Sequence, residues 1–448
     1  MSILGKRLQA VDNTEREIVQ RVATEAIQVS TDETEIVRRL TRTISTQFRD
    51  EIAKYGLSHD VKLKIRAAIE AAAKSEVPDY EQQQRIAKIT CDNIIGLGPL
   101  ENYMNDPEIT EIIVQRYDNI CVEKAGIMHR VNATFTGEEQ LQTIINRIVQ
   151  PIGRQINLSS PIVDARLSNG SRVNATIPPV TPDGATLSIR KFSDKAITGE
   201  DYINLGSINR PMLDFLAKCV EGKVSMIVSG GTSTGKTTLL NMLSSYIPPN
   251  ELIITIEDSC ELQLHQPNIR RMEARQTTAE GMMPITTQVL VKNALRMRPD
   301  RIIVGEIRDG TIVDMMSAMS TGHEGSMSTV HANNPGNLMN SRMPILYGMN
   351  DNVKFSTDTQ NMQITEALQM VVHISRLRNG KRKITHITEV CGLTEKGRVK
   401  LNDIFRYNEQ TDCFEATGYV PEAILERLKA RGITINPDFF EKEDPNDF

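Results

Sequence analysis

The chain has 448 residues, of which 39% are hydrophobic, so we expect two or three domains with sizeable cores. Its net charge of −5, its lack of Trp and its few aromatic residues argue against a nucleic-acid surface along the whole chain and against platforms for stacking bases. No apolar run is long enough to span a membrane, and the polar N-terminus lacks the apolar core of a secretory signal, so we expect a cytoplasmic protein.

The first 90 residues predict a helical N-terminal extension. Apolar residues recur at helical spacing within 14–27 and again within 36–48, and Gly56 then interrupts the pattern. Charged residues occupy the outer faces of these helices. We interpret residues 1–90 as a small helical bundle or an arm that carries no chemistry of its own.

Residues 91–192 predict a mixed α+β domain. Short β-rich segments between 109 and 132 are separated by turn residues, and a helix is expected through 141–148. Asn-Gly at 169–170 and Asp-Gly at 183–184 indicate two hairpins.

We place a domain boundary in the polar connection at 191–207, which contains two glycines. From 200 to 432, strands alternate with helices, which is the pattern of an α/β domain built on a mostly parallel sheet. Residues 433–448 form an acidic tail, whose last part, 441–448, we expect to be frayed.

The most informative motif fits G-x-x-x-x-G-K-[ST] at every fixed position. An expected buried strand at 224–228 precedes it, and an amphipathic helix follows it. Glycines let main-chain N–H groups face a polyphosphate, and the N-terminus of the helix adds the positive end of its dipole. We therefore predict nucleotide binding, with the Lys236 ammonium at the β and γ phosphates and the Thr237 hydroxyl on Mg²⁺. The candidate nucleotide-binding residues are Gly230, Gly231, Thr232, Ser233, Thr234, Gly235, Lys236, Thr237 and Thr238.

Two apolar segments end in carboxylates at the expected C-terminal edge of this sheet, where ligands of α/β folds bind. Glu306 follows the segment 301–305 and is expected to hold Mg²⁺, directly or through water; alternatively it caps the strand and pairs with Arg308. Glu257 ends the segment 252–257 and is the candidate to polarise the attacking water; alternatively it is a surface carboxylate.

A segment from 321 to 333 is punctuated by glycines and carries two of the seven histidines, His323 and His331. We interpret it as a sensor of the γ-phosphate or as a segment that couples subunits, with a purely structural role as the alternative. A zinc site shared by the two histidines is a further alternative, although no cysteine ligand supports it.

Together these segments resemble the secretion and pilus-assembly ATPase superfamily of type II and type IV systems, and most closely the CpaF-like ATPases of Tad pili. The matching motifs are the phosphate loop, an acidic box at 256–262, the segment 293–300, a Walker B strand at 300–308 and a histidine box at 322–333. The resemblance spans about residues 90–415. Two departures are the segment 339–353 and the lack of the tetracysteine zinc module of many type II secretion ATPases, since the six cysteines form no C-x-x-C pair.

The resemblance implies a PAS-like α+β domain hinged to a RecA-like domain, with ATP between them, and it implies a homohexamer. It also implies that arginines of the α+β domain reach the nucleotide phosphates. On that basis Arg172 and Arg190 are candidate arginine fingers, and Arg166 is a third phosphate contact. The alternative is that these arginines pair with carboxylates such as Asp164 or Asp183.

The leading hypothesis is a motor that hydrolyses ATP with Mg²⁺ and drives pilus assembly or protein secretion through an inner-membrane platform protein. Such a motor would be cytoplasmic and peripheral at the inner membrane through that partner, with no direct nucleic-acid contact. One alternative is the ATPase of a conjugative type IV secretion system, whose motifs overlap with these. Another is a nucleic-acid translocase such as a helicase, although the basic run at 376–383 contains Asn379-Gly380 and is typical of a hairpin tip.

Overall fold

The computed structural model describes residues 31–124, 126–192, 196–275, 283–351 and 353–441. The helix expected within 14–27 and residues 442–448 of the acidic tail lie outside these ranges. The chain divides into two compact units, Met1–Ser193 and Asp194–Phe448, and each is described by itself. Both units combine helices with a sheet, so the α/β class expected from the sequence is confirmed.

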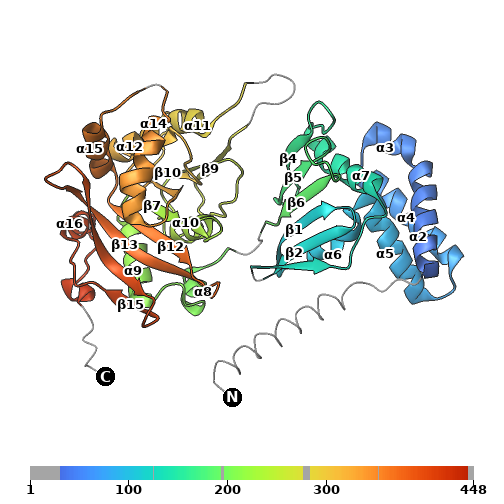
Figure 1. The fold of residues 1–448 in the computed structure, drawn as a ribbon, viewed down its shortest axis with the longest axis horizontal. Coiled ribbons are helices and arrows are strands. Elements are labelled where there is room, and N and C mark those ends of the chain that lie inside the picture. Colours follow the sequence, from blue (N-terminus) through green and yellow to red (C-terminus); the bar gives the residue numbers. More distant parts are fainter. Residues whose placement is uncertain (1–30, 125, 193–195, 276–282, 352, 442–448) are drawn as a thin grey trace, which may run out of the picture. The chain divides into compact units, whose positions relative to one another are not determined.

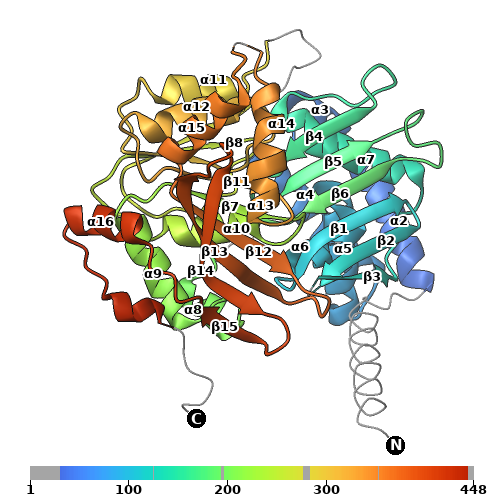
Figure 2. The same ribbon diagram turned by 60° about the vertical axis from the view of Figure 1, so that its left-hand side comes forward.

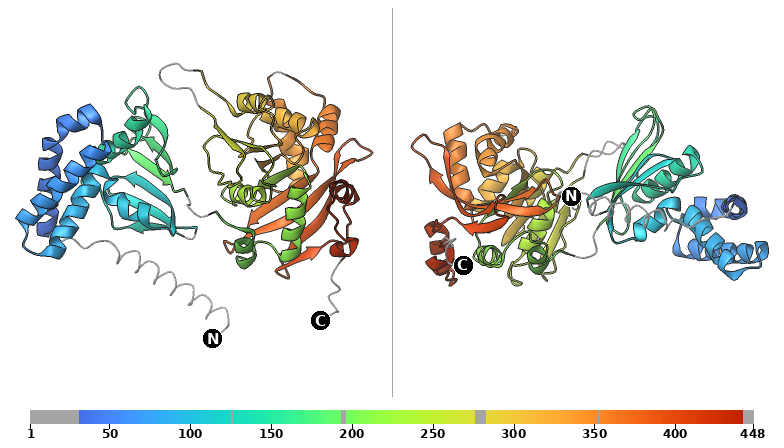
Figure 3. Two further views of the ribbon diagram at one scale, coloured as in Figure 1. Left: turned by 180° about the vertical axis from the view of Figure 1, so that it is seen from behind. Right: turned by 60° about the horizontal axis from the view of Figure 1, so that its bottom comes forward.

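Four helices open the described part of the first unit and pack around a shared apolar core (blue in Figure 3). They are α2 (Thr31–Gln47), α3 (Arg49–Tyr55), α4 (His59–Glu76) and α5 (Tyr80–Ile95). On α4 the buried residues Ile65, Ile69 and Ala73 follow one another at a spacing of four, which places them on one face of the helix. The short helices η1 (Gly98–Leu100) and α6 (Glu101–Asn105) lead from this bundle to the sheet.

The remainder of the first unit is a six-stranded antiparallel sheet with one long helix (Figure 1). In spatial order the strands are β3 (Ile127–Val131), β2 (Asn119–Lys124), β1 (Ile109–Arg116), β6 (Thr186–Arg190), β5 (Arg172–Thr176) and β4 (Ile162–Arg166). Helix α7 (Glu138–Val149), which continues into η2 (Gln150–Ile152), contributes Leu141, Ile144 and Ile145 to the core of this sheet. The two predicted hairpin turns contain Gly170 and Gly184 at φ of +87° and +125°, where only glycine fits readily.

A nine-stranded sheet organises the second unit (Figure 1). In spatial order its strands are β15 (Cys413–Ala416), β14 (Val399–Asn408), β13 (Arg382–Leu393), β12 (Met370–Arg376), β7 (Met226–Gly230), β11 (Met327–His331), β10 (Arg301–Val304), β8 (Ile253–Glu257) and β9 (Ile269–Glu273). From β12 to β9 neighbouring strands are parallel, while β13, β14 and β15 extend the sheet antiparallel beside β12 (Figure 2). The buried strands β7, β8 and β10 are largely continuous apolar runs, as expected for parallel strands covered on both faces.

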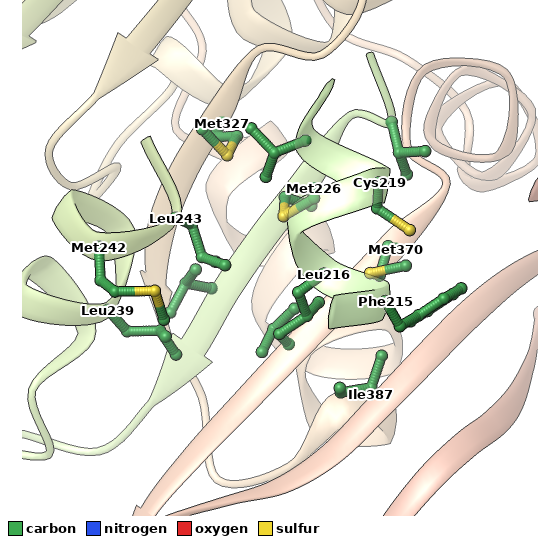
Figure 4. Packing of buried hydrophobic residues seen from close by; sticks show 14 of the residues in the cluster. Phe215, Leu216, Cys219, Met226, Leu239, Met242, Leu243, Met327, Met370 and Ile387 are labelled. Atoms are coloured by element: carbon green, nitrogen blue, oxygen red, sulfur yellow. The ribbon is translucent and has the colours of Figure 1, made fainter. Parts of the chain in front are cut away.

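Helices cover both faces of the nine-stranded sheet. They are α8 (Gly199–Asn204), α9 (Arg210–Glu221), α10 (Lys236–Ser244), α11 (Thr287–Ala294), α12 (Thr311–Ser320), α13 (Pro335–Asn337), η3 (Leu338–Arg342), α14 (Met343–Gly348), α15 (Thr357–Ala367), α16 (Glu422–Ala430) and η4 (Pro437–Phe440). Phe215 of α9 and Leu239 of α10 belong to the core on one face (Figure 4), and Met315 of α12 and Ile364 of α15 to the core on the other. Among the helices of the described ranges, none combines the length and apolar character that a membrane span requires.

Helix α8 lies inside the segment that the sequence predicted to be a polar connection. A capping box starts this helix: Thr198 Oγ1 accepts a hydrogen bond from the Asp201 N–H at 3.2 Å, and the Asp201 carboxylate accepts one from the Thr198 N–H at 2.9 Å. A helix of six residues is too short to show hydrophobic periodicity, so only the cap predicts it.

A buried ion pair connects β10 to the preceding helices at the N-terminal end of that strand. The Arg301 side chain is fully buried and donates to both carboxylate oxygens of Glu251, from Nε at 2.7 Å and from Nη2 at 3.1 Å. Its Nη1 also donates to the Val220 carbonyl oxygen, in the last turn of α9, at 2.6 Å. This bidentate pair therefore holds α9, β10 and the turn before β8 together.

Replacing Glu251 by Gln should lower the free energy of unfolding by about 3–5 kcal/mol, because the buried Arg301 charge loses its counter-ion. Urea unfolding followed by circular dichroism measures the effect. The matched control is Glu200→Gln in the pair of Glu200 with Arg210, whose side chains are 62% and 52% exposed, and it should leave the free energy of unfolding nearly unchanged. Equal effects of the two substitutions would show that the buried pair of Arg301 with Glu251 contributes no more to the stability of the unit than a surface pair does.

Candidate active site

Four candidate segments meet at one edge of the nine-stranded sheet. Because β8, β10, β11 and β7 are parallel neighbours, their carboxyl ends lie side by side. This edge carries Glu257, which ends β8, Glu306, which follows β10, and His331, which ends β11 in register with Gly230 of β7. The edge is where ligands of open α/β sheets bind.

The phosphate loop joins β7 to α10. Gly235 has φ of +93° and Ser233 has φ of +57°, so the loop uses the left-handed conformation twice within three residues. A Cβ added at Gly230 would lie 2.4 Å from the Ile374 carbonyl oxygen, which excludes a side chain there. Helix α10 begins at Lys236 without a side-chain cap, so its first N–H groups face the loop as a potential anion site.

Lys236, His331 and Glu306 contact one another at this edge. Lys236 Nζ donates to the Gly231 carbonyl oxygen at 2.9 Å and lies 3.3 Å from both ring nitrogens of His331. His331 Nε2 is 2.7 Å from Glu306 Oε1. Arg308 hydrogen-bonds the other oxygen of Glu306, so the pairing expected from the sequence is present beside the contact with His331.

Burial shapes the charge states of this cluster. Burial lowers the pKa of Lys236, while the nearby Glu306 carboxylate opposes that effect. Burial and the Lys236 ammonium lower the pKa of His331, so its ring is neutral at pH 7. A neutral imidazole can accept a hydrogen bond from Lys236 at one of its nitrogens, while Nε2 remains in close contact with Glu306 Oε1.

Glu257 is buried, with 3% of its surface exposed, so the alternative of a surface carboxylate is wrong. Its Oε2 accepts hydrogen bonds from the N–H groups of Glu261 at 2.8 Å and Leu262 at 3.1 Å. A Cβ added at Gly305 would come within 2.9 Å of Glu257 Cγ, so the glycine makes room for this side chain beside the end of β10. The main chain thus fixes the orientation of the Glu257 carboxylate.

His323 is not brought to this cluster. It precedes β11, whereas His331 ends it, and a five-residue strand separates the two by about 15 Å. The His323 carbonyl oxygen accepts from Ser326 Oγ at 2.7 Å, and the adjacent Glu324 pairs with Arg427 at 3.4 Å. A role of His323 as a catalytic sensor of the γ-phosphate, one of the interpretations of its segment, has no geometric support within this unit, and neither does a zinc site shared with His331.

The three candidate arginines form a row across the first unit. Arg166 of β4 is the register partner of Arg172 on β5, and Arg172 is the register partner of Arg190 on β6. Arg166 Nε donates to the Gly170 carbonyl oxygen at 3.1 Å. Asp164, suggested above as an alternative partner, accepts a hydrogen bond from Asn174 Nδ2 at 2.9 Å. In-register positions on adjacent strands carry the three side chains on one face of the sheet.

Two residues near the phosphate loop were missed in the sequence. Arg382, at the start of β13, donates from Nε to the Ser233 carbonyl oxygen at 3.3 Å. His373 of β12 hydrogen-bonds Ser229, the residue that precedes Gly230. The Asn379-Gly380 turn predicts the hairpin that carries Arg382 and His373, but no motif predicts that β12 pairs with β7.

The side chains at this edge fit a magnesium–polyphosphate. Thr237, in the first turn of α10, offers a hydroxyl, and Glu306 offers a carboxylate, which are oxygen donors of the kind Mg²⁺ prefers. The uncapped N-terminus of α10 and the Lys236 ammonium provide positive potential for phosphate oxygens.

Comparison with known proteins identifies relatives of this chain. The model of a family described as type II/IV secretion system protein matches residues 94–419. A putative conjugal transfer protein of Mycobacterium tuberculosis is 32% identical over 300 residues, which cover 66% of this chain and 84% of the relative. The type IV secretion system protein VirB11 of Brucella suis is 30% identical over 281 residues, which cover 57% and 77%.

Solved structures with a similar chain include an ATPase and a pilus retraction motor. The VirB11 ATPase of the Brucella suis type IV secretion system, in complex with sulphate, has 26% identity and a TM-score of 0.36, covering 64% of this chain and 91% of that one. The pilus retraction motor PilT with bound ADP has 19% identity and a TM-score of 0.49, covering 66% and 83%.

The two glycines that open the phosphate loop should differ in their tolerance of a side chain. We expect Gly230→Ala to lower the free energy of unfolding by about 1–3 kcal/mol, because the methyl group meets the main chain of Ile374. Gly231→Ala should leave stability nearly unchanged, because its nearest neighbour, Thr234 Cγ2, would be 3.6 Å away. Thermal unfolding of the two variants makes the comparison, and a stable Gly230→Ala protein would contradict the described loop.

Proposed function

This chain belongs to the type II/IV secretion system protein family, and we propose that it hydrolyses ATP as the motor of a pilus-assembly or secretion machine. The observation that carries the proposal is the contact of Lys236, His331 and Glu306 at the carboxyl edge of the parallel sheet. A phosphate loop alone only binds nucleotide. At this edge, the imidazole of His331 connects Lys236 of the loop to Glu306, which lies two strands away. We propose that these groups respond to the terminal phosphate.

In the proposed reaction, each group at the edge has a separate task. The main-chain N–H groups of the loop and Lys236 bind the phosphates, and the Glu257 carboxylate accepts a proton from the attacking water. Thr237 and Glu306 would hold Mg²⁺, which when bound neutralises charge on the phosphate oxygens. The neutral His331 ring keeps Lys236 and Glu306 at a fixed separation.

The remaining charge stabilisation is assigned to the first unit. We propose that Arg172 and Arg190 act as arginine fingers, with Arg166 beside them, because three guanidinium groups in one cross-strand row suit a phosphate group. We propose in addition that the first unit has a PAS-like fold and the second a RecA-like fold, and that the chain forms a homohexamer.

The proposed partner is a platform protein of the inner membrane, reached from the cytoplasmic side. The helical bundle α2–α5 is one candidate surface for that contact. We also propose that His323, which lies away from the phosphate loop, belongs to a segment that couples subunits rather than to the hydrolytic centre.

A conjugative type IV secretion ATPase is the second candidate. It is supported by the similarity to a putative conjugal transfer protein and to VirB11. A nucleic-acid translocase has less support, because the basic run at 376–383 spans the hairpin between β12 and β13, where Arg382 contacts the phosphate loop. Stimulation of ATP hydrolysis by DNA, lost steeply with rising salt, would favour the translocase over both secretion roles.

Lys236→Ala should reduce ATP hydrolysis by about 100-fold or more, because the phosphates lose their principal cation. Glu257→Gln should retain nucleotide affinity and lose turnover, since the amide accepts no proton. A coupled phosphate-release assay and a titration with fluorescent ATP measure both quantities. Glu273→Gln is the matched control, because Glu273 is the register partner of Glu257 on the edge strand β9, and its turnover should stay within about twofold of the parent. Normal turnover in Glu257→Gln would refute the assignment of this base.

Arg172→Ala and Arg190→Ala should each slow hydrolysis by roughly 10³-fold if they act as fingers. The control is Arg130→Ala, which removes an exposed arginine from β3 at the other edge of the same sheet. Single-turnover hydrolysis at saturating ATP separates the chemical step from binding. Unchanged rates in both finger variants would leave these arginines with a structural role only.

A further inference from the structure

His373 lies directly beneath the start of the phosphate loop. It occupies the middle of β12 at the register position of Ser229 on β7, and only 2% of its surface is exposed. Its Nδ1 is 2.8 Å from Ser229 Oγ in a fully buried hydrogen bond. Because Ser229 is followed at once by Gly230, this bond fixes the last side chain before the loop leaves the sheet.

The main chain of Asn333 lies close enough to the same imidazole ring to raise its pKa against the effect of burial. Asn333 is two residues beyond His331, whose ring contacts Lys236 and Glu306. His373 therefore contacts two segments that are about 100 residues apart in the chain and that also pair directly, since His331 is the register partner of Gly230.

The protonation state of His373 matches these two partners. Burial lowers the pKa of His373 to about 4, and His386 of β13 and Lys236 of α10 act in the same direction. The neutral ring has one donor and one acceptor nitrogen. Ser229 can donate its hydroxyl hydrogen to Nδ1 while the other ring nitrogen donates to the carbonyl oxygen of Asn333, so both nitrogens are satisfied.

Packing alone does not explain an imidazole at this position. Val371, two positions earlier on the same face of β12, is fully buried and apolar, and an apolar ring would fill the space of His373 without the cost of removing two nitrogens from water. The value of the imidazole therefore lies in the hydrogen bonds that its two nitrogens can form.

We propose that His373 is a positioning residue for ATP hydrolysis, which holds the phosphate loop and the segment 331–333 at the separation that lets His331 contact both Lys236 and Glu306. The inference rests on the proposed ATPase function, and it assigns His373 no direct contact with the nucleotide. His373 acts through Ser229 on one side and through Asn333 on the other.

The test compares His373→Phe, His373→Asn and Ser229→Ala with two matched controls in the same sheet. His386→Phe removes the neighbouring imidazole, whose ring centroid is 6.0 Å from that of His373. Ser328→Ala removes a buried hydroxyl from β11, where Ser328 Oγ donates to the Thr329 carbonyl oxygen at 3.4 Å. ATP turnover, KM and the Kd for fluorescent ATP are measured for all five variants and the parent.

We expect His373→Phe to lower kcat by about 10- to 100-fold, while KM and Kd change by less than about threefold, because misplacement affects the transition state more than ground-state binding. His373→Asn should lose less, since its amide reaches the position of Nδ1 and keeps the bond to Ser229. Ser229→Ala should lower kcat by about fivefold, the effect of one buried hydrogen bond. Both controls should stay within about twofold of the parent.

Hydrogen exchange of the full chain gives a readout that does not depend on hydrolysis. In His373→Phe, peptides covering 230–236 and 331–337 should both exchange faster than in the parent, whereas His386→Phe should not produce this paired change. A parent protein without ATPase activity would refute the proposed function, and the exchange data would still test the connection. Parental kcat in His373→Phe, faster exchange in only one segment, or an equal loss in His386→Phe would overturn the inference.

Discussion

Parallel pairing of β7, β11, β10 and β8 is the constraint on which the active edge depends. Each of these strands ends at the same border of the sheet, so groups from four residues converge there: Gly230, Glu257, Glu306 and His331. They converge although Gly230 and Glu306 are almost 80 residues apart in the chain. Antiparallel neighbours would send alternate strand ends to opposite borders. The extension β13–β15 does run antiparallel, and it contributes to the edge through the start of β13, where Arg382 reaches Ser233.

Burial gives the charged groups of the second unit two different tasks. At the N-terminal end of β10, Arg301 meets its full complement of acceptors in Glu251 and the end of α9, and the result is a closed ion pair. At the carboxyl edge, Lys236 and Glu306 are separated by the neutral ring of His331 instead of pairing directly. In the proposed site this arrangement keeps the Lys236 ammonium oriented toward the loop, while Glu306 has its ion pair with Arg308 instead.

Predictions from the sequence were correct where a short segment contains the residues that determine its structure. The strand expected at 224–228 overlaps β7, the glycine turns at 170 and 184 join antiparallel strands, and Glu257 and Glu306 do lie at strand ends. They failed where contact depends on strand order. The spacing of His323 and His331 suggested a common role, but β11 lies between them. His373 belongs to no recognisable motif, because its pairing with Ser229 depends on the position of β12 in the sheet. Helix α8 was missed because six residues show a cap but no periodicity.

Strand β7 has hydrogen-bonded neighbours on both sides, β12 and β11, and its five residues are all buried. A strand in that position is among the last parts of a sheet to open, since freeing it breaks two ladders at once. The loop from Gly231 to Gly235 is therefore attached to a rigid strand and not to a flexible one. In the proposed motor, movement driven by ATP hydrolysis must then occur in segments that have fewer hydrogen-bonded neighbours, which makes stiffness at the centre of the sheet a condition for movement at its periphery.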